Sequence, residues 1–376
     1  MLAFEYFTTL ELVGLIALGI SLFFQLIYYW FIFGRLAFHR KRKNDLKQVP
    51  VSIVISARNE YENLRKNLPV ILDQEYSDFE VVVVDDNSDD ETEGLLKELA
   101  TIYPKLKPVR IHQQVNVFSG KKFPLSIGIK SARNELLLLT DADCKPSSPY
   151  WLKEMQEAFN DNTDLVLGFS PFAKKPGLLN ALIRWDNLHA AIKYLSFALI
   201  GTPYKGEGRN IAYKRSLFMK NNGFTQHYGI SSGDDDLFVS QIGNRKNTRI
   251  QVSSISHTIS DSEISYSKWW RKQKENKIKA KFYKKRFKFL LGLYQFTNLI
   301  FYLSLIELAY FSEQYYLIGG LFAIKLLSQI FIFKMCTIKL GIKQWISVGV
   351  VLDLIYTFLN PIIAFSNLMV NKSQWK

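Results

Sequence analysis

Three short apolar runs, each ending in polar or acidic residues, restrict this chain to an α/β fold. The runs are Val51 to Ser56, Phe79 to Val84 and Leu136 to Leu139. Amphipathic stretches with helical spacing lie between them, such as Tyr61 to Gln74. Continuous apolar strands that alternate with helices are typical of a mostly parallel sheet covered on both faces. Ligands of such sheets bind at the carboxyl ends of the strands, so we expect a site along that edge.

Asp141 and Asp143 follow the third run and are separated by one alanine. Residues i and i+2 of an extended chain point the same way, so both carboxylates can face one ion. Hard divalent cations such as Mg2+ or Mn2+ take oxygen ligands, and Mg2+ usually binds one or two carboxylates plus substrate phosphates. The pair therefore predicts a Mg2+ or Mn2+ site, with a turn or capping role as the alternative.

A second acidic pair, Asp85 and Asp86, ends the second apolar run. A carboxylate at this position can hydrogen-bond the base or ribose of a nucleotide. The alternative is that one of the two caps the helix that begins near Glu91, a role that Asp89 or Asp90 can also fill.

The third acidic cluster consists of Asp234, Asp235 and Asp236, directly before an apolar helical stretch. A helix N-terminus favours acidic side chains, so capping is one interpretation. The other is a general base, because burial and crowded like charges raise the pKa of a carboxyl toward neutrality.

Four segments are long and apolar enough to cross a membrane. Val13 to Gly34 has 22 residues without a charge, and about 20 residues suffice to cross the hydrocarbon core. The basic run Arg35 to Lys43 follows it, which predicts an external N-terminus and a cytoplasmic central domain. Three more candidates lie near the C-terminus: Phe289 to Phe311, Tyr315 to Phe333 and Trp345 to Val370. If all three cross, the C-terminus lies outside.

Each C-terminal candidate contains one charged residue, namely Glu307, Lys325 or Asp353. A charged side chain inside a membrane is energetically costly, and such residues tend to have a functional role. Two interpretations stay open: pairing within the helix bundle, and contact with a membrane-embedded substrate.

The net charge of +14 comes largely from one segment, Lys268 to Lys288, which has eleven Lys or Arg residues and one acid. Aromatic residues lie between the basic ones, and a membrane candidate follows. We therefore expect an interfacial helix that attracts anionic lipid, rather than a nucleic-acid site. Leu178 to Gly201 is also amphipathic; packing under the site is favoured over contact with an acceptor or the membrane. The two cysteines, Cys144 and Cys336, exclude a disulfide framework and indicate a reducing compartment.

Together, these motifs resemble the inverting glycosyltransferases of family 2, in their membrane-anchored form. The resemblance covers about Val51 to Lys281 and rests on five motifs in order. They are VSIVISARNEYENL, FEVVVVDDNSDDET, GKKFPLSIGIKSARNELLLLTDAD, GEGRNIAYKRSLF and GDDDLFV.

The resemblance implies a GT-A fold, an α/β, Rossmann-like domain with a mostly parallel sheet, which we expect over residues 50–265. A transmembrane anchor with a basic juxtamembrane segment is expected at 1–49. A basic interfacial helix is expected at 266–288, followed by about three transmembrane helices at 289–376.

The resemblance also implies a role for individual residues. It implies that the nucleotide sugar is bound by Ser56, Arg58, Glu60, Asp86, Lys121, Asp141, Gly208 and Asn210. Asp141 and Asp143 would hold Mg2+ or Mn2+ on the diphosphate, with Asp143 the more direct ligand. Asp234 aligns best with the catalytic base, and Asp235 and Asp236 are the alternatives. Trp269, Trp270 and Gln273 are expected at the membrane interface, near the acceptor.

One departure from the family concerns the polymer-forming members, which often carry Gln-x-x-Arg-Trp after the base. Gln273 is present here, but Asn276 and Lys277 occupy the Arg and Trp positions. This difference favours transfer of a single sugar over processive synthesis.

The expected activity is inverting transfer of a sugar from a nucleotide-diphosphate sugar, with a uridine diphosphate sugar as the first choice. The expected acceptor is a hydroxyl of a lipid-linked or polysaccharide glycan of the cell envelope, at the cytoplasmic face of the plasma membrane. The second enzyme class considered is a phosphotransferase of the haloacid dehalogenase type, which also places Asp-x-Asp after a strand. Against it, Asp143 is followed by Cys144 and Lys145. A degenerate transferase domain serving as a membrane scaffold is the non-enzymatic alternative.

Overall fold

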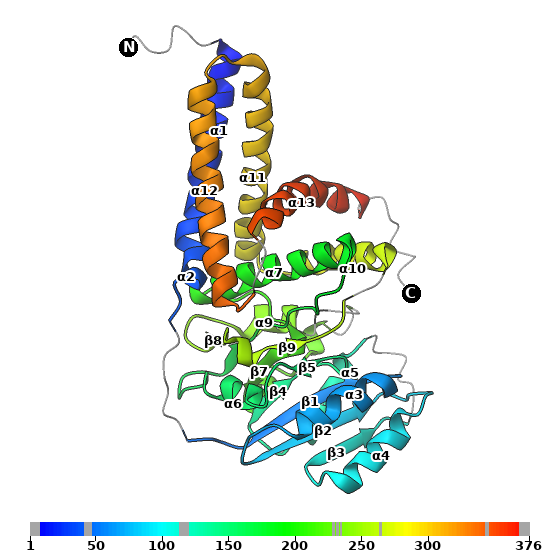
Figure 1. Cartoon of the computed structure of the whole chain (residues 1–376). Coiled ribbons are helices and arrows are strands. Elements are labelled where there is room, and N and C mark those ends of the chain that lie inside the picture. Colours follow the sequence, from blue (N-terminus) through cyan, green and yellow to red (C-terminus); the bar gives the residue numbers. More distant parts are fainter. Residues whose placement is uncertain are drawn as a thin grey trace. The chain divides into compact units, whose positions relative to one another are not determined.

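The computed structural model describes residues 8–40, 47–112, 120–227, 230, 233, 235–262, 265–342 and 346–367. The chain divides into two compact units. Residues 40–275 form one unit, here called the catalytic unit. Residues 1–39 and 276–376 form the other, here called the membrane unit. Both are drawn in Figure 1.

A seven-stranded sheet forms the centre of the catalytic unit, in the order β3-β2-β1-β4-β7-β6-β8 (Figure 1). Its first four strands are parallel, β7 is antiparallel to both of its neighbours, and β6 and β8 are parallel to each other. The strands are β1 Val51–Ala57, β2 Phe79–Asp85, β3 Leu106–Arg110, β4 Leu136–Leu139, β6 Leu165–Leu167, β7 Ile211–Lys214 and β8 Thr248–Ile250. A second sheet pairs β5 Lys145–Pro146 with β9 Thr258–Ile259. The expected mostly parallel sheet is confirmed.

Burial explains why the apolar runs form these strands. Every residue of β1, β2 and β4 is buried, as expected for strands covered on both faces. The helices of the unit are α3 Tyr61–Leu72, α4 Thr92–Ile102, α5 Lys122–Ser131, α6 Trp151–Gln156, α7 Leu178–Leu199, α8 Arg215–Lys220 and α9 Asp236–Ile242. Gly128 of α5 shows how tightly a helix packs on the sheet, because a Cβ there would lie 2.6 Å from Val54 and 2.9 Å from Val84.

Among the described residues of the membrane unit, four helices are long and apolar enough to cross a membrane. They are α1 Thr9–Ile27, continued by a π-helical segment Tyr28–Phe33 and by α2 Gly34–Ala37, then α11 Lys285–Phe311, α12 Tyr315–Lys339 and α13 Ile346–Ser366. The fourth candidate window is Gly349–Ser366. The expected arrangement of one N-terminal and three C-terminal apolar helices is therefore present.

Helices α1 and α11 are antiparallel neighbours along most of their length. Tyr28 donates to the carbonyl of Leu290 at 2.5 Å, and the amide of Gln25 donates to the carbonyl of Tyr294 at 3.0 Å. Near the other end, a Cβ at Gly14 would lie 3.0 Å from Leu308. The hydrogen bonds of Tyr28 and Gln25 lie between the two helices, so these polar groups do not face the apolar surroundings.

Lys325 of α12 and Asp353 of α13 are linked inside the bundle through Gln329. The Lys325 amine donates to the Tyr302 hydroxyl at 2.6 Å and to Gln329 Oε1 at 3.1 Å. The amide of Gln329 donates to the carboxylate of Asp353 at 2.7 Å. Because these side chains are almost fully buried, internal pairing explains Lys325 and Asp353 without a membrane-embedded substrate.

The basic segment differs from the expected single helix over 266–288. Helix α10 covers Tyr266–Ala280, and α11 begins at Lys285. The backbone leaves the helix at Lys281, whose amide bonds the carbonyl of Ile278 three residues earlier. Residues 266–280 of the expected helix thus belong to α10, and residues 285–288 form the first turn of the long apolar helix α11.

Candidate active site

The ends of three parallel strands bring the predicted nucleotide and metal residues to one edge of the sheet. Val54 of β1 pairs with Leu139 of β4, so Ser56 and Asp141 continue these strands at the same level. Ala57 of β1 pairs with Asp85 of β2, and Asp86 follows directly. The edge that we expected from the three apolar runs therefore exists, and it is lined by carboxylates.

The loops after β1 and β2 are joined by side-chain hydrogen bonds. The Asn59 amide donates to Ser88 Oγ at 2.9 Å, and the Asp89 amide donates to Asn59 Oδ1 at 2.8 Å. Asn59 and Asn87 both have positive φ, a conformation that asparagine tolerates well. Asp90 accepts from the amide of Thr92, the first residue of α4. Asp90 therefore serves the helix start, as one of the sequence-based alternatives held, and Asp86 needs no capping role.

Three polar side chains on this edge are partly or fully buried. Burial raises the pKa of Asp86, although the charge of Arg58 opposes the shift. Burial also raises the pKa of Glu60, against a hydrogen bond from Asn63. The hydroxyl of Ser56 is buried and bonds to no group in the part of the chain that the structure describes. Such groups are suited to a polar ligand that completes their hydrogen bonds.

The Asp-x-Asp pair lies at the end of β4 with one cation beside it. Lys121, at the start of α5, forms an ion pair of 2.9 Å with Asp141. Asp143 is half-buried, and burial together with the neighbouring Asp141 charge raises its pKa. The thiol of Cys144 donates weakly to Asp143 at 3.4 Å. A carboxylate held in this way is stabilised by added positive charge.

These two carboxylates fit a hard divalent cation as far as the protein supplies ligands. Among the described residues, no three His, Cys, Asp or Glu side chains come together to form a complete metal cage. Two carboxylate oxygens, with substrate phosphates and water, are a usual set for Mg2+. The donor set therefore fits a cation that is shared with a phosphorylated substrate.

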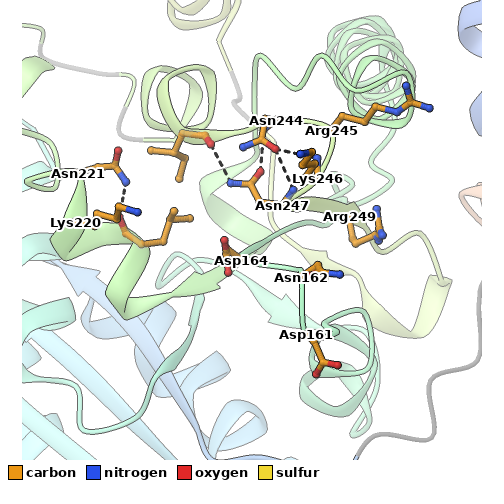
Figure 2. A pocket seen from close by; sticks show the side chains of 12 residues that line it. Asp161, Asn162, Asp164, Lys220, Asn221, Asn244, Arg245, Lys246, Asn247 and Arg249 are labelled. Carbon is orange, nitrogen blue, oxygen red and sulfur yellow. Dashed lines mark hydrogen bonds between the residues drawn. The ribbon is translucent and has the colours of Figure 1, made fainter.

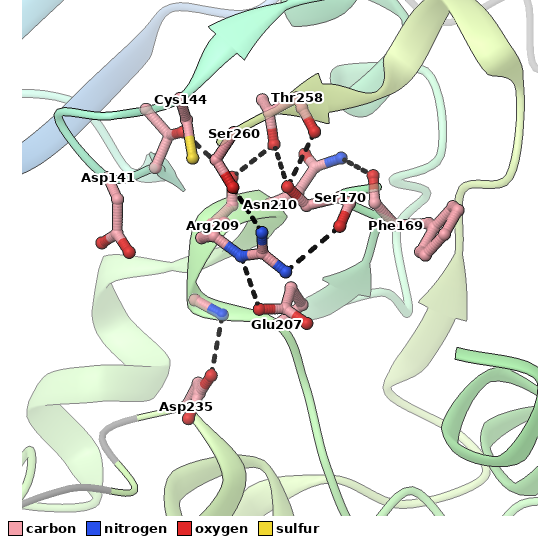
Figure 3. Close-up of polar contacts among 12 residues, drawn as sticks. Asp141, Cys144, Phe169, Ser170, Glu207, Arg209, Asn210, Asp235, Thr258 and Ser260 are labelled. Atoms are coloured by element: carbon pink, nitrogen blue, oxygen red, sulfur yellow. Dashed lines mark hydrogen bonds and ion pairs between the residues drawn. The ribbon is translucent and has the colours of Figure 1, made fainter. Parts of the chain in front are cut away.

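A buried charged pair holds the segment before β7, beside the Asp-x-Asp loop. The Arg209 Nε atom lies 2.8 Å from the Glu207 carboxylate. The same guanidinium donates to Ser260 Oγ at 2.5 Å and to the carbonyl of Ser170 at 3.1 Å (Figure 3). The hydroxyl of Thr140, the residue before Asp141, donates to the carbonyl of Arg209 at 2.9 Å. Burial alone would lower the pKa of Arg209, but the Glu207 carboxylate raises it.

Asn210, expected to bind the nucleotide sugar, has a structural role instead. Its side chain is fully buried. Its carboxamide accepts from the indole of Trp151 at 3.0 Å and donates to the carbonyls of Phe169 and Ser256, each at 2.8 Å. All three bonds lie inside the unit, so the carboxamide of Asn210 fixes the wall of the site. Gly208 is bound in the same wall through its amide.

The acidic triplet divides into residues with different surroundings. Asp235 accepts from the Gly208 amide at 2.9 Å and from the Asp236 amide at 2.7 Å, and it is the N-cap of α9 (Figure 3). Asp236 is buried and lies 3.5 Å from the Lys205 amine. Burial alone would lower the pKa of Lys205, but Asp236 and Glu207 raise it. Asp234, expected to be the base, lies outside the described residues.

Lys122 is a buried cation that sequence reasoning missed. It follows Lys121, yet its side chain points into the unit and is almost fully buried. Its amine donates to the carbonyl of His227 at 2.9 Å and also to the carbonyl of Ile230. Lys122 thereby fastens the chain ahead of the acidic triplet to the start of α5. Gly120, with positive φ, makes the turn that precedes the two lysines.

Replacing Lys122 with methionine is expected to lower the free energy of unfolding by about 1.5–3 kcal/mol, because charge-assisted hydrogen bonds to two buried carbonyls are lost. Denaturant unfolding of the purified protein measures this change. Lys130→Met alters an exposed lysine of the same helix, so it should change stability by no more than about 0.5 kcal/mol. Equal effects of the two substitutions would contradict the anchoring role of Lys122.

The residues expected at the membrane interface face partly inward. Trp269 and Gln273 of α10 are buried, and the Gln273 amide donates to Asp186 of α7 at 2.7 Å. Gln273 therefore joins two helices of the catalytic unit. Trp270 is half-buried beside Trp269, with ring centroids 6.3 Å apart. Helix α7 covers Leu178–Leu199, and 12 of its 22 residues are buried, including every residue from Tyr194 to Ala198.

A separate polar hollow of about 780 Å3 lies away from the strand ends described above (Figure 2). It surrounds the turn Asn244–Asn247, whose asparagine side chains bond the backbone of that turn. Asp164, at its edge, forms an ion pair of 2.8 Å with Lys214. The polar groups of the hollow thus stabilise a turn, and it includes none of the predicted site residues.

The mostly parallel sheet, with carboxylates along one edge, agrees with the GT-A fold that the family resemblance implies. Over residues 52–221, the chain matches the family model described as Glycosyl transferase family 2. Residues 52–221 therefore match a family 2 glycosyltransferase domain, the class that the motifs resemble, rather than a phosphotransferase.

Named proteins with related sequences are also glycosyltransferases. Glycosyltransferase AglE of Haloferax volcanii is 27% identical over 191 residues, covering 49% of this chain and 58% of that protein. Beta-monoglucosyldiacylglycerol synthase of Trichormus variabilis is 35% identical over 100 residues, covering 26% of this chain and 21% of that protein. The chain thus spans less than two thirds of these relatives.

A solved structure shares the fold over most of the chain. The mannosyltransferase PcManGT from Pyrobaculum calidifontis, solved with GDP-Man and Mn2+, superimposes with a TM-score of 0.57 at 18% identity. The match covers 93% of this chain and 99% of that chain. At this level of identity, the comparison supports the fold.

Proposed function

We propose that this protein transfers one sugar, with inversion, from a nucleotide-diphosphate sugar to a hydroxyl of a lipid-linked acceptor at the cytoplasmic face of the plasma membrane. One observation carries the proposal: the carboxylates of Asp86, Asp141 and Asp143 lie along the same edge of one sheet, beside the buried Ser56 hydroxyl. A nucleoside diphosphate offers these groups suitable partners: the base and ribose can form hydrogen bonds with a carboxylate or hydroxyl, and the charged phosphate oxygens can share a cation with carboxylates.

The residues on the first two strand ends bind the nucleoside in this proposal. Ser56 and Asp86 form hydrogen bonds with the base and ribose. These bonds give the buried Ser56 hydroxyl a partner and engage the partly buried Asp86 carboxylate. Arg58 and Lys121 are exposed cations beside them, suited to screening the phosphates. Lys121 would then leave Asp141 and pair with the diphosphate, since the cation that replaces it carries more charge.

Asp141 and Asp143 would hold Mg2+ or Mn2+. When bound, such an ion stabilises the negative charge that develops on the leaving diphosphate. The printed title of the fold neighbour names Mn2+ with GDP-Man, which is consistent with this proposal. The protein's own contribution is to keep both carboxylates at the end of a rigid buried strand, β4.

The base is proposed to be Asp234. Asp235 is engaged by two backbone amides, and Asp236 is buried near Lys205. A carboxylate that removes the proton of the acceptor hydroxyl has to reach that hydroxyl, and both of these neighbours are committed to the protein. The two occupied neighbours therefore favour Asp234, in agreement with the position implied by the family resemblance.

A membrane-bound acceptor is favoured by the membrane unit. Exposed aromatic residues border the apolar bundle at two levels: Trp30 and Phe331, which stack at 5.7 Å, and Tyr315 and Tyr316 at the start of α12. Phe331 follows Tyr315 by 16 positions, or roughly 24 Å at the helical rise, close to the thickness of a hydrocarbon core. Aromatic residues favour both interfaces of a bilayer.

The basic residues that follow Trp30 favour the cytoplasmic side for its level. Arg35 lies in the last turn of the first apolar helix and Arg40 follows that helix, and the positive-inside rule favours the cytoplasm for such residues. A related protein is named for synthesis of a glucosyl diacylglycerol, which supports a lipid acceptor for this chain. The basic residues of α10 and the start of α11 would add attraction to anionic lipid.

The proposal predicts metal-dependent release of a nucleoside diphosphate. Purified protein is incubated with Mg2+ or Mn2+ and a panel of sugar nucleotides, beginning with uridine diphosphate sugars and followed by GDP-mannose. Release of the nucleoside diphosphate is measured with and without a lipid extract. We expect one donor to be used preferentially, with stimulation by lipid. Chelation should abolish release and added metal should restore it, because Asp141 and Asp143 are acceptor-only ligands.

The donor panel also separates the proposal from a non-enzymatic scaffold. A scaffold with a degenerate domain would release no nucleoside diphosphate from any donor, with or without lipid. Release that persists at full rate after chelation would remove the metal from the proposal while leaving sugar transfer intact. Stimulation by a soluble oligosaccharide but not by lipid would overturn the lipid acceptor.

A further inference from the structure

Helix α3 buries one amide among apolar side chains. Its buried residues are Leu64, Asn67, Leu68, Ile71 and Leu72. Asn67 is only 4% exposed, so its polar atoms are removed from water together with the leucines beside it. A buried amide is costly unless its hydrogen bonds are made inside the protein. The hydrogen-bond partner of Asn67 therefore indicates why an asparagine occupies this position.

The partner of Asn67 is the middle residue of the Asp-x-Asp pair. The Asn67 Nδ2 atom donates to the carbonyl oxygen of Ala142 at 3.1 Å, across 75 positions of the chain. Ala142 as a whole is 3% exposed, whereas the acids on either side of it, Asp141 and Asp143, are half-buried. Asn67 thus holds the backbone between the two proposed metal ligands from the interior of the unit.

The Asp-x-Asp segment forms a tight turn. The amide of Cys144 donates to the carbonyl of Asp141 at 3.1 Å, three residues earlier. This bond makes Ala142 and Asp143 the two central residues of a β-turn. Asp143 is not among the described residues that have positive φ. The carboxylate of Asp143 is therefore carried by the second central residue of a turn with negative φ at that position.

The peptide between the two central residues of a β-turn can point in opposite directions. Turn types I and II differ mainly in this peptide, and type II requires positive φ at the second central residue. Aspartate tolerates positive φ better than most residues, so its own preference does not prevent Asp143 from adopting it. The amide of Asn67 binds the carbonyl of this peptide, that of Ala142. The bond therefore selects one of the two directions, and with it the direction in which the Asp143 side chain leaves the backbone.

Both ends of the turn are fixed independently of Asn67. Before the turn, the hydroxyl of Thr140 donates to the carbonyl of Arg209 at 2.9 Å. After the turn, β5 pairs with β9 in the second sheet. Loss of the Asn67 bond would therefore free the middle of the turn while its two ends stay in place.

We propose that Asn67 is a positioning residue for the metal site: its amide fixes the middle peptide of the Asp-x-Asp turn and thereby sets the direction of the Asp143 carboxylate. Asn67 acts through the backbone of Ala142 and contacts neither the donor nor the ion. The inference rests on the proposed role of Asp141 and Asp143 as ligands of Mg2+ or Mn2+. A partner that orients a metal ligand typically contributes roughly 10- to 100-fold in metal affinity or activity.

Binding of Mn2+ to the purified protein tests the inference. Free Mn2+ is measured by electron paramagnetic resonance while the ion is titrated into the native protein and into Asn67→Leu, which has a side chain of similar size without a donor. We expect Asn67→Leu to bind Mn2+ roughly 10- to 100-fold more weakly.

The matched control is Asn247→Leu. Asn247 is also a buried asparagine, and its amide donates to the carbonyl of Ile242 at 3.1 Å. It borders the hollow of Figure 2, which includes none of the predicted site residues. Because the same chemical change is made away from the Asp-x-Asp turn, Asn247→Leu should bind Mn2+ as the native protein does.

Release of nucleoside diphosphate provides a second readout. It is measured with the preferred donor over a range of Mn2+ concentrations. In Asn67→Leu, the Mn2+ concentration for half-maximal release should rise by the same factor as the loss of affinity, while kcat at saturating Mn2+ stays close to the native value, since both carboxylates are still present. Asn67→Ala also lacks the donor and suits a helix well, so it should show the same shift and replaces the leucine variant if that one does not fold.

The outcomes separate this inference from the proposed function. Equal Mn2+ affinity in the native protein and in the Asn67 variants would overturn the positioning role and leave the proposed function untouched. An equal loss of affinity in Asn67→Leu and Asn247→Leu would also overturn it, because that loss would reflect the stability of the unit rather than the direction of one peptide. If the native protein bound no Mn2+, the metal site and the role of Asn67 would both fail. A native protein that binds Mn2+ but uses no donor would contradict the proposed sugar transfer alone.

Discussion

Replacing Asp143 with asparagine is expected to lower kcat for sugar transfer by roughly 100- to 1000-fold, the loss typical when one group that stabilises developing charge is removed. Asparagine keeps the size of the side chain and its place after β4 but removes the negative charge. Burial and the neighbouring Asp141 raise the pKa of Asp143, so this carboxylate is stabilised by added positive charge. The rate of nucleoside diphosphate release at saturating donor measures the effect.

The control for Asp143→Asn is Asp161→Asn, which makes the same chemical change at an exposed aspartate bordering the hollow of Figure 2. We expect Asp161→Asn to keep the native rate. Raising the Mn2+ concentration should partly restore Asp143→Asn, because Asp141 remains as a ligand. A rate for Asp143→Asn within threefold of the native one would contradict the proposed metal site, since roughly 0.7 kcal/mol of transition-state stabilisation is too little for a metal ligand.

The sequence alone predicted the parts of the catalytic unit that depend on local patterns. The apolar runs at Val51 and Phe79 became the fully buried strands β1 and β2, because continuous apolar sequence of that length suits a strand covered on both faces. The acids after the strands were expected on one edge, and the parallel register brings those strand ends level. The four apolar helices were found in the same way, from length and composition.

Side-chain directions that depend on contacts between distant residues could not be predicted from the sequence. Asn210 lies in a motif implied to contact the sugar, yet its carboxamide bonds Trp151 and two carbonyls far away in the chain. Lys121 and Lys122 are adjacent and chemically identical, but one reaches Asp141 and the other is buried against the carbonyl of His227. Sequence spacing carries no information on which of two neighbouring lysines faces inward at a turn.

The side of α13 that faces its neighbours is a second example. Its composition is that of a spanning helix, and length with hydropathy cannot show which side of such a helix faces the bundle. That information comes from the pairing of Asp353 with Gln329 and of Thr357 with Asn298. Polar residues inside apolar helices therefore indicate orientation only after their partners are known.

Arg209→Met is expected to lower the free energy of unfolding of the catalytic unit by about 3–5 kcal/mol, because it leaves the carboxylate of Glu207 buried without its cation. The guanidinium lies 2.8 Å from Glu207, and the two side chains are only 10% and 17% exposed. The same guanidinium holds Ser260 and the carbonyl of Ser170, so its loss also frees the segment that contains Gly208. Denaturant unfolding followed by tryptophan fluorescence measures the change, since Trp151 and Trp185 are fully buried in this unit.

Two further variants separate the charge from the packing of Arg209. In Glu207→Gln/Arg209→Met both charges are removed, so we expect a smaller loss of stability than in Arg209→Met alone, because no uncompensated charge stays buried. Arg65→Met changes an arginine that is 62% exposed, and it should alter stability by no more than about 0.5 kcal/mol. If the double variant were as unstable as Arg209→Met, the hydrogen bonds to Ser260 and Ser170 would explain the loss, and the charge of Glu207 would not.

Sugar transfer by the double variant tests whether Arg209 and Glu207 position the segment that contains Gly208. If they position Gly208 and the Asp235 carboxylate that accepts from its amide, kcat should fall even where the protein stays folded, while the KM for the donor changes less.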